Sequence, residues 1–114
     1  MTYYDLIAEK EVDGFKIIVD KTYEDMNLSN LFDEDELDEI YTKINDGTYE
    51  WFTLRVRAML NGHEFGSAYL GGCLYEWNKV EDVMTDGTAD EGINEAVYEA
   101  KQEVVRMKAL LEVM

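Results

Sequence analysis

Apolar and polar residues alternate along four stretches of the chain, and a turn-forming dipeptide separates the members of each pair. Asp13-Gly14 lies between the first two stretches, and Asn61-Gly62 lies between the last two. Both dipeptides favour a two-residue type I′ turn, in which both central residues adopt positive φ. The pattern therefore predicts two β-hairpins.

A two-residue turn also fixes which residues face each other across a hairpin. In the first hairpin, Val12 would pair with Phe15, and Glu11 would face Lys16 as a favourable charge pair. In the second hairpin, the same rule gives the pairs Leu60–His63, Ala58–Phe65 and Val56–Ser67. Both registers collect apolar side chains on one face, so each hairpin is expected to cover a core.

Helical patterns follow each hairpin. Asp33 and Glu36 have the spacing of a capping box, which predicts a helix that runs to about Ile44 or Asn45 and ends at Gly47. A second capping-box spacing, Thr88 to Glu91, begins a long helix that continues to the C-terminus. The order strand–strand–helix, repeated once, predicts a single α+β domain over residues 1–114. We expect a four-stranded antiparallel sheet with both helices on one face. Gly71-Gly72 would form a bulge or a bend, and residues 73–75 could extend the strand beyond it.

The second helix carries an apolar heptad seam. At about 1.5 Å per residue, a helix over residues 91–114 would be about 36 Å long and could extend past the sheet that it covers. Its apolar positions would pack on the sheet of the same chain, and the overhanging ones could join two copies into a homodimer. The positions of this possible dimer seam are Val104, Met107, Leu111 and Met114.

The charge of the chain changes the functional picture more than its motifs do. Its 114 residues include 26 acidic and 10 basic side chains, for a net charge of −16, and 46% are hydrophobic. The apolar content is too high for a disordered acidic tail. This negative charge excludes direct electrostatic binding of the protein to nucleic acid or to an anionic membrane surface. A net charge of about 2–8 keeps a small domain soluble, so solubility alone does not require this excess.

The excess is concentrated in two segments. Residues 31–50 hold eight acidic and one basic side chain, and residues 76–114 hold ten acidic and four basic ones. Such carboxylates can imitate the phosphates of DNA and be attracted to a basic groove. The residues that we expect to form this acidic surface are Asp33, Glu34, Asp35, Glu36, Asp38, Glu39, Asp46, Glu76, Glu81 and Asp82.

In size, charge, absence of proline and its cluster at residues 33–39, the chain resembles the small acidic anti-restriction and anti-CRISPR proteins of phages and mobile elements. Some members of that class inhibit nucleases by mimicking DNA. The resemblance implies a non-enzymatic inhibitor that binds the basic nucleic-acid site of a host protein. The alternative is an interaction or assembly module that uses the long helix and an aromatic strand face, where Trp51 accompanies Arg55 and Arg57, with charge serving only solubility.

Residues that could carry catalysis or bind metal are few. Cys73 is the single cysteine and His63 the single histidine, and they lie ten positions apart on one predicted strand. They could form a nucleophile–base pair only if Gly71-Gly72 reversed the chain. We read Cys73 as a small buried apolar residue. Residues 25–36 have the spacing of an EF-hand loop, which makes a calcium-binding module the third candidate function, but a strand precedes them where a helix is needed. We therefore expect no enzyme activity, cofactor or metal site. The single cysteine and an N-terminus without a signal-peptide pattern favour the cytoplasm.

Overall fold

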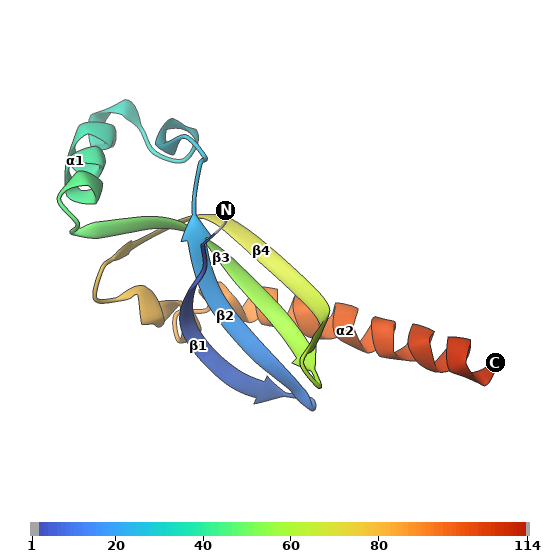
Figure 1. The fold of residues 1–114 in the computed structure, drawn as a ribbon. Coiled ribbons are helices and arrows are strands. Elements are labelled where there is room, and N and C mark those ends of the chain that lie inside the picture. The colour runs from blue at the N-terminus through green and yellow to red at the C-terminus, as the bar shows by residue number, and fades with distance from the viewer. Residues whose placement is uncertain (1–2, 114) are drawn as a thin grey trace.

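The computed structural model describes residues 3–113 and contains one antiparallel sheet of four strands with two α-helices (Figure 1). The strands lie side by side in chain order, β1-β2-β3-β4. The elements are β1 (Asp5–Val12), β2 (Phe15–Tyr23), the short 3-10 helix η1 (Leu28–Asn30), α1 (Glu34–Asn45), β3 (Tyr49–Leu60), β4 (His63–Glu76), the 3-10 helix η2 (Val80–Met84) and α2 (Thr88–Glu112). The predicted α+β class and the order ββαββα are confirmed.

Both predicted hairpin turns are present. Asp13 and Gly14 have φ values of 53° and 89°, and Asn61 and Gly62 have values of 52° and 81°. These positive values are those a type I′ turn requires, and they explain why Asn, Asp and Gly occupy the four positions. The register of the first hairpin is also confirmed, since Val12 pairs with Phe15 and Glu11 with Lys16.

The register predicted for the second hairpin is correct only next to the turn. Leu60 pairs with His63, but Ala58 pairs with Gly66 instead of Phe65, and the pairs from there to Leu54 are displaced by one residue. The cause lies in the packing of α2. A Cβ atom at position 66 would lie 2.1 Å from the carbonyl oxygen of Ala96, so only glycine fits under the helix there. A bulge around Phe65 brings Gly66 to this position.

The second irregularity of this hairpin is the one expected at Gly71-Gly72. Phe52 pairs with Cys73 and Leu54 with Leu70, so the two glycines lie opposite a single residue of β3. Gly72 has a φ of 74°, which glycine adopts without strain. β4 then continues to Glu76, as the prediction of an extended strand requires.

The core lies between one face of the sheet and α2. Ile17, Val19, Leu54 and Val56 are almost completely buried on the sheet. Opposite them, α2 presents small residues that let its backbone approach closely, namely Ala89, Gly92, Ala96 and Ala100. Close approach of this kind leaves little void, as dense protein interiors require.

The placement expected for the first helix is wrong. α1 does not cover the sheet but forms a separate projection beyond one end of it (Figure 1). Only Ile40 of α1 is buried, whereas five residues of α2 are buried. The apolar face of α1 is too small to compete with α2 for the sheet. The capping boxes are also not formed: Asp33 is the N-cap of α1 without a side-chain hydrogen bond, and the N-cap of α2 is Gly87 instead of Thr88.

The molecule is elongated, with principal extents of 60 × 28 × 24 Å. Its radius of gyration is 17.0 Å, whereas a compact chain of this length has a value of about 13 Å. The projection of α1 at one end and the overhang of α2 at the other account for the difference (Figure 1). Neither helix in residues 3–113 combines the length and apolar composition that a membrane crossing requires.

Candidate interaction surfaces

Most of the acidic residues lie at one end of the molecule. β3 begins directly after α1, β4 leads directly into η2, and Tyr49 at the start of β3 pairs with Glu76 at the end of β4. This pairing brings the segment that contains α1 and the segment that contains η2 to the same end of the sheet. We call residues 24–50 and 76–91 together the acidic head.

The acidic head holds nearly all the net charge. Residues 24–50 contain ten acidic and one basic side chain, and residues 76–91 contain six acidic and one basic. All other positions together contain ten acidic and eight basic side chains, which nearly balance. The molecule is therefore electrostatically polarised along its long axis.

Within the head, most of the predicted carboxylates form two groups, one on α1 and its N-cap and one on η2. Those of α1 and its N-cap are all exposed. At about 100° per residue, Glu34, Asp35, Asp38 and Glu39 point away from Ile40, whereas Glu36 lies on the same side as Ile40. Glu81 and Asp82 are exposed on η2, which is separate from α1 in Figure 1 and packs on the core through Val80 and Val83. The first group comprises Asp33, Glu34, Asp35, Glu36, Asp38 and Glu39.

Three of the predicted carboxylates have local partners. Glu39 pairs with Lys43 at 3.1 Å, and Glu76 pairs with Lys79 at 3.4 Å. Asp46 accepts a hydrogen bond of 2.9 Å from the backbone N–H of Thr48, and bonding to Thr48 lowers the pKa of Asp46. Exposed pairs of this kind contribute little to stability. These pairs leave the net charge of the acidic head strongly negative.

A buried carboxylate that the sequence pattern does not single out, Glu24, ties the head to the sheet. The Glu24 side chain is 6% exposed. It accepts hydrogen bonds from the backbone N–H of Met26 at 2.9 Å, from the backbone N–H of Gly72 at 2.8 Å and from Thr53 Oγ1 at 2.6 Å. Burial raises the pKa of Glu24, but these hydrogen bonds outweigh it and hold the pKa below its usual value. The carboxylate therefore stays charged and links the loop after β2 to the bulge of β4.

Trp51 fixes the same region from β3. Its indole Nε1–H donates to the carbonyl oxygen of Met26 at 3.2 Å, and the edge of Phe32 lies against it with ring centroids 6.2 Å apart. The segment that leads from β2 to α1 is thus held by a tryptophan and a buried carboxylate. Its contacts position α1 although that helix does not rest on the sheet.

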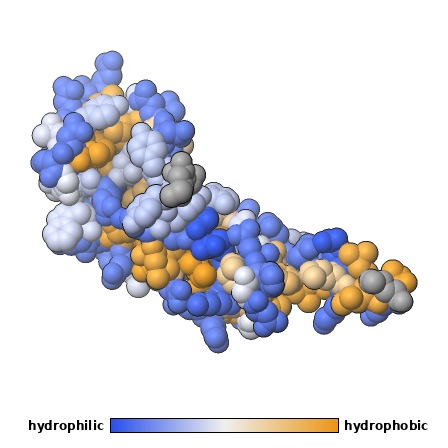
Figure 2. All heavy atoms as spheres, in the orientation of Figure 1, coloured by the Kyte–Doolittle hydropathy of each residue, from blue (hydrophilic) through white to orange (hydrophobic). Residues whose placement is uncertain are grey.

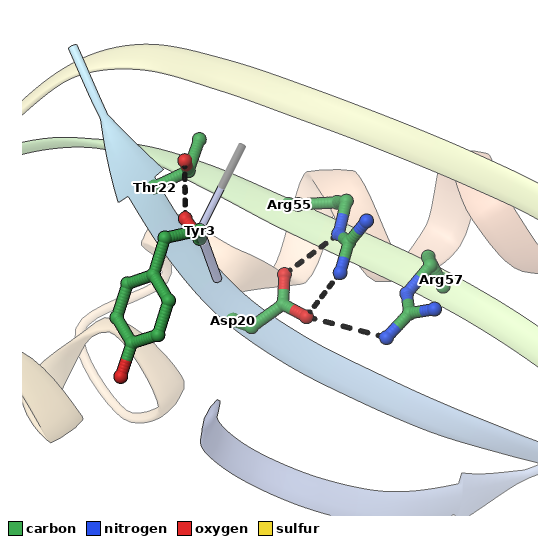
Figure 3. Close-up of polar contacts among 5 residues, drawn as sticks. All are labelled: Tyr3, Asp20, Thr22, Arg55 and Arg57. Atoms are coloured by element: carbon green, nitrogen blue, oxygen red, sulfur yellow. Dashed lines mark hydrogen bonds and ion pairs between the residues drawn. The ribbon is translucent and has the colours of Figure 1, made fainter. Parts of the chain in front are cut away.

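The sheet face away from α2 carries a buried ion cluster (Figure 3). Asp20, 3% exposed, accepts two hydrogen bonds from Arg55, at 2.8 and 2.6 Å, and one from Arg57 at 3.3 Å. The Arg55 guanidinium also lies 3.4 Å from the ring centroid of Tyr4, and the hydrogen bonds to Asp20 raise the pKa of Arg55. Arg55 is therefore occupied within the fold, which reduces its availability as the interface anchor expected from the sequence.

The opposite end of the molecule exposes apolar residues of α2, which Figure 2 shows as a hydrophobic region far from the hydrophilic projection of α1. Val104 still packs against the core. Met107 and Leu111 are 42% and 67% exposed, and Leu110 beside them is 51% exposed. At about 100° per residue, Val104, Met107 and Leu111 continue the stripe that rests on the sheet. Met114 lies outside the described residues.

Cys73 is buried, as predicted, with 5% exposure, and burial raises the pKa of its thiol to about 11. His63 is exposed at the start of β4, the strand that also holds Cys73. Among residues 3–113, no three His, Cys, Asp or Glu side chains are grouped closely enough to hold a metal ion. In the segment with EF-hand spacing, Asn27 Oδ1 instead accepts a hydrogen bond from the backbone N–H of Ser29 at 3.0 Å.

Comparisons with protein-family models, with curated proteins and with solved structures found no match to this chain.

Proposed function

We propose that this protein is a non-enzymatic inhibitor whose acidic head docks on the basic nucleic-acid-binding surface of another protein. The observation that carries the proposal is the segregation of charge, because nearly all the net negative charge lies at one end of an elongated molecule. In the phage or mobile-element class that the sequence resembles, the partner is a host nuclease or another defence protein in the cytoplasm. Docking would block the access of nucleic acid to that surface.

The charge density of α1 supports this reading. The six carboxylates from Asp33 to Glu39 occupy about 9 Å of helix axis at about 1.5 Å per residue. Their spacing of about 1.5 Å per charge is close to the value of about 1.7 Å for duplex DNA. α1 alone therefore reproduces the charge density of DNA over a length of about three base pairs, at about 3.4 Å each.

The arrangement also favours fast and oriented association. Charge gathered at one end makes a strong local field, which steers a protein toward a basic surface at low ionic strength. The same charge spread evenly over the molecule would serve solubility as well but would not orient it. The concentration of negative charge at one end therefore favours a role in binding a partner over a role in solubility alone.

The apolar end of α2 supports a second candidate function, that of an assembly module. Met107, Leu110 and Leu111 are exposed there, and residues 101–113 hold two acidic and three basic side chains. Two copies could meet at this end with the least repulsion between their acidic heads. In this alternative, the tail joins two copies into a homodimer or binds a partner helix, and the charge serves only solubility.

Affinity capture with matched charge variants tests the proposal. One variant neutralises four carboxylates of the head, and a control neutralises four exposed carboxylates elsewhere, so that both lose the same charge. The head variant carries Glu34→Gln, Asp35→Asn, Glu36→Gln and Asp38→Asn, and the control carries Glu11→Gln, Glu64→Gln, Glu95→Gln and Glu99→Gln.

We expect the wild type and the control to retain nucleic-acid-binding proteins from a bacterial lysate at low salt, and duplex DNA or added salt to displace them. The head variant should lose them. Equal behaviour of the head variant and the control would overturn the proposal. Partners that resist both DNA and salt would favour the assembly module instead.

A further inference from the structure

A hollow of about 400 Å³ lies between α1 and the end of β2, where the chain passes from the sheet to the head. Three aromatic residues line it, one from each surrounding element: Tyr23 from β2, Tyr41 from α1 and Trp51 from β3. Its volume falls in the lower part of the range of about 300–1,000 Å³ that is usual for ligand sites. It has room for one side chain or a small molecule.

The lining has the chemistry of a site for a cation. Asp25 adds an exposed carboxylate to the three aromatic residues, and the Glu24 carboxylate, although held within the fold, adds negative charge behind them. None of the lining residues in the described part of the chain is Lys, Arg or His. The faces of aromatic rings carry partial negative charge and attract cations. Tyr23 and Tyr41 are 83% and 43% exposed, so their rings are accessible.

Nearby aromatic rings of this protein already hold its own cations. Lys43 Nζ lies 5.0 Å from the ring centroid of Tyr49, and Lys21 Nζ lies 5.8 Å from that of Phe52. The described residues show no such partner for Tyr23, Tyr41 or Trp51. The hollow therefore offers aromatic rings and a carboxylate, as these neighbouring lysine sites do. No lysine or arginine of the described residues occupies its rings.

The walls are fixed before any partner arrives. Glu24 holds the loop through three hydrogen bonds, and Trp51 is held by the carbonyl of Met26 and the edge of Phe32. A site that is already ordered loses less conformational entropy when it binds.

We propose that this hollow receives an arginine side chain from the basic surface of the partner, with the guanidinium on the exposed rings and paired with Asp25. The inference rests on the proposed function and specifies how the head recognises its partner. Arginine is favoured over lysine because its planar guanidinium stacks on aromatic rings, forms bidentate pairs with carboxylates and is more weakly hydrated. The acidic head would supply long-range attraction, and the hollow would supply the contact.

Tryptophan fluorescence tests this contact directly. Trp77→Phe removes the second tryptophan, which is 64% exposed near η2, and leaves Trp51 as the only reporter. The probes are a capped pentapeptide Gly-Gly-Arg-Gly-Gly and the same peptide with neutral citrulline in place of arginine. Titration at about 0.5 M salt suppresses attraction between distant charges.

We expect a saturable change with the arginine peptide at millimolar concentration and none with the citrulline peptide. Tyr23→Ala and Asp25→Asn should each weaken binding about fivefold, since each removes an interaction of about 1 kcal/mol. Tyr98→Ala on α2, where the side chain is 67% exposed, and Glu95→Gln are the matched controls and should leave binding unchanged. Equal signals from both peptides, or no saturation, would overturn the inference.

The two proposals fail separately. If the arginine peptide does not bind but the four-carboxylate head variant still loses its DNA-displaceable partners, the docking function stands and the arginine site is wrong. If the peptide binds but the head variant captures the same partners as its control, the site stands and the docking function is wrong.

Discussion

Replacing Glu24 with glutamine is the sharpest test of how the acidic head is attached to the sheet. One carboxylate oxygen accepts from the N–H of Met26, and the other accepts from both the N–H of Gly72 and the hydroxyl of Thr53. Glutamine has one acceptor oxygen and one NH2 group. Whichever way the amide is turned, its NH2 group faces a backbone N–H, so at least one buried donor loses its partner.

The cost can be derived from these contacts. A buried donor left without a partner costs about 1–3 kcal/mol, and hydrogen bonds to a charged acceptor are worth more than those to a neutral one. We therefore expect Glu24→Gln to lower the free energy of unfolding by about 2–4 kcal/mol. For a chain of this length, about 4 °C of melting temperature corresponds to 1 kcal/mol, so the melting temperature should fall by about 8–16 °C.

Urea unfolding at several pH values measures this effect. Hydrogen bonds hold the pKa of Glu24 below its ordinary value of 4.5, despite the opposing effect of burial. The stabilisation by the carboxylate is therefore complete above about pH 4.5 and is lost as the pH falls through the lower pKa of the folded state. The difference between wild type and variant should be constant near pH 7 and shrink in acid. Glu99→Gln, on an exposed face of α2, should change stability by less than about 0.5 kcal/mol. A Glu24→Gln protein as stable as the wild type at pH 7 would refute the reasoning.

Three further predictions concern α2 and the core. Gly66→Ala places a Cβ atom 2.1 Å from the Ala96 carbonyl oxygen, so it should cost at least about 1–3 kcal/mol in chemical unfolding; an unchanged midpoint would contradict the close approach of α2. Leu111→Asp, at a side chain 67% exposed, should leave the stability of the monomer nearly unchanged but abolish any concentration-dependent association seen by light scattering. Association that survives the substitution would exclude this stripe as the contact. Because burial raises the pKa of Cys73 to about 11, its thiol should react with a thiol reagent only in denaturant, and rapid reaction of the native protein would contradict its burial.

Local sequence signals were sufficient for the hairpins and for the class of fold. Asp13-Gly14 and Asn61-Gly62 specify turns by the positive φ that they tolerate, and the neighbouring register follows from the turn. The displacement at Phe65 was not predictable from the turn. It depends on where α2 presses on Gly66, which is a contact between residues thirty positions apart in the chain.

Local sequence also does not specify long-range packing for α1, which is why its expected placement on the sheet is wrong. Its amphipathic pattern predicts a helix with one apolar face, but not which surface that face will cover. α2 has more buried positions and a set of small residues that fit closely on the sheet, so α2, together with Val80 and Val83 of η2, covers that face. The apolar face of α1 then packs on η1 and β3 beyond the area that α2 covers, and only Ile40 of this helix is buried.

For the candidate site, the sequence predicts where charge is dense but not which carboxylates are structural. Asp33 to Glu39 are exposed as expected. Asp20 and Glu24 are buried, and nothing in their immediate neighbours along the chain distinguishes them. Their partners Arg55, Thr53 and Gly72 come from other strands, so their roles depend on the order of strands in the sheet.

The separation of charge along the 60 Å axis gives the molecule a large electric dipole moment. A dipole in the field of a cationic surface experiences a torque, so the molecule would rotate as it approaches and arrive with α1 foremost. The hydrophobic end of α2 would then point into solvent, out of reach of the surface but open to other molecules. Contact at one end therefore leaves the other end free, and a single copy could connect two unlike partners at the same time.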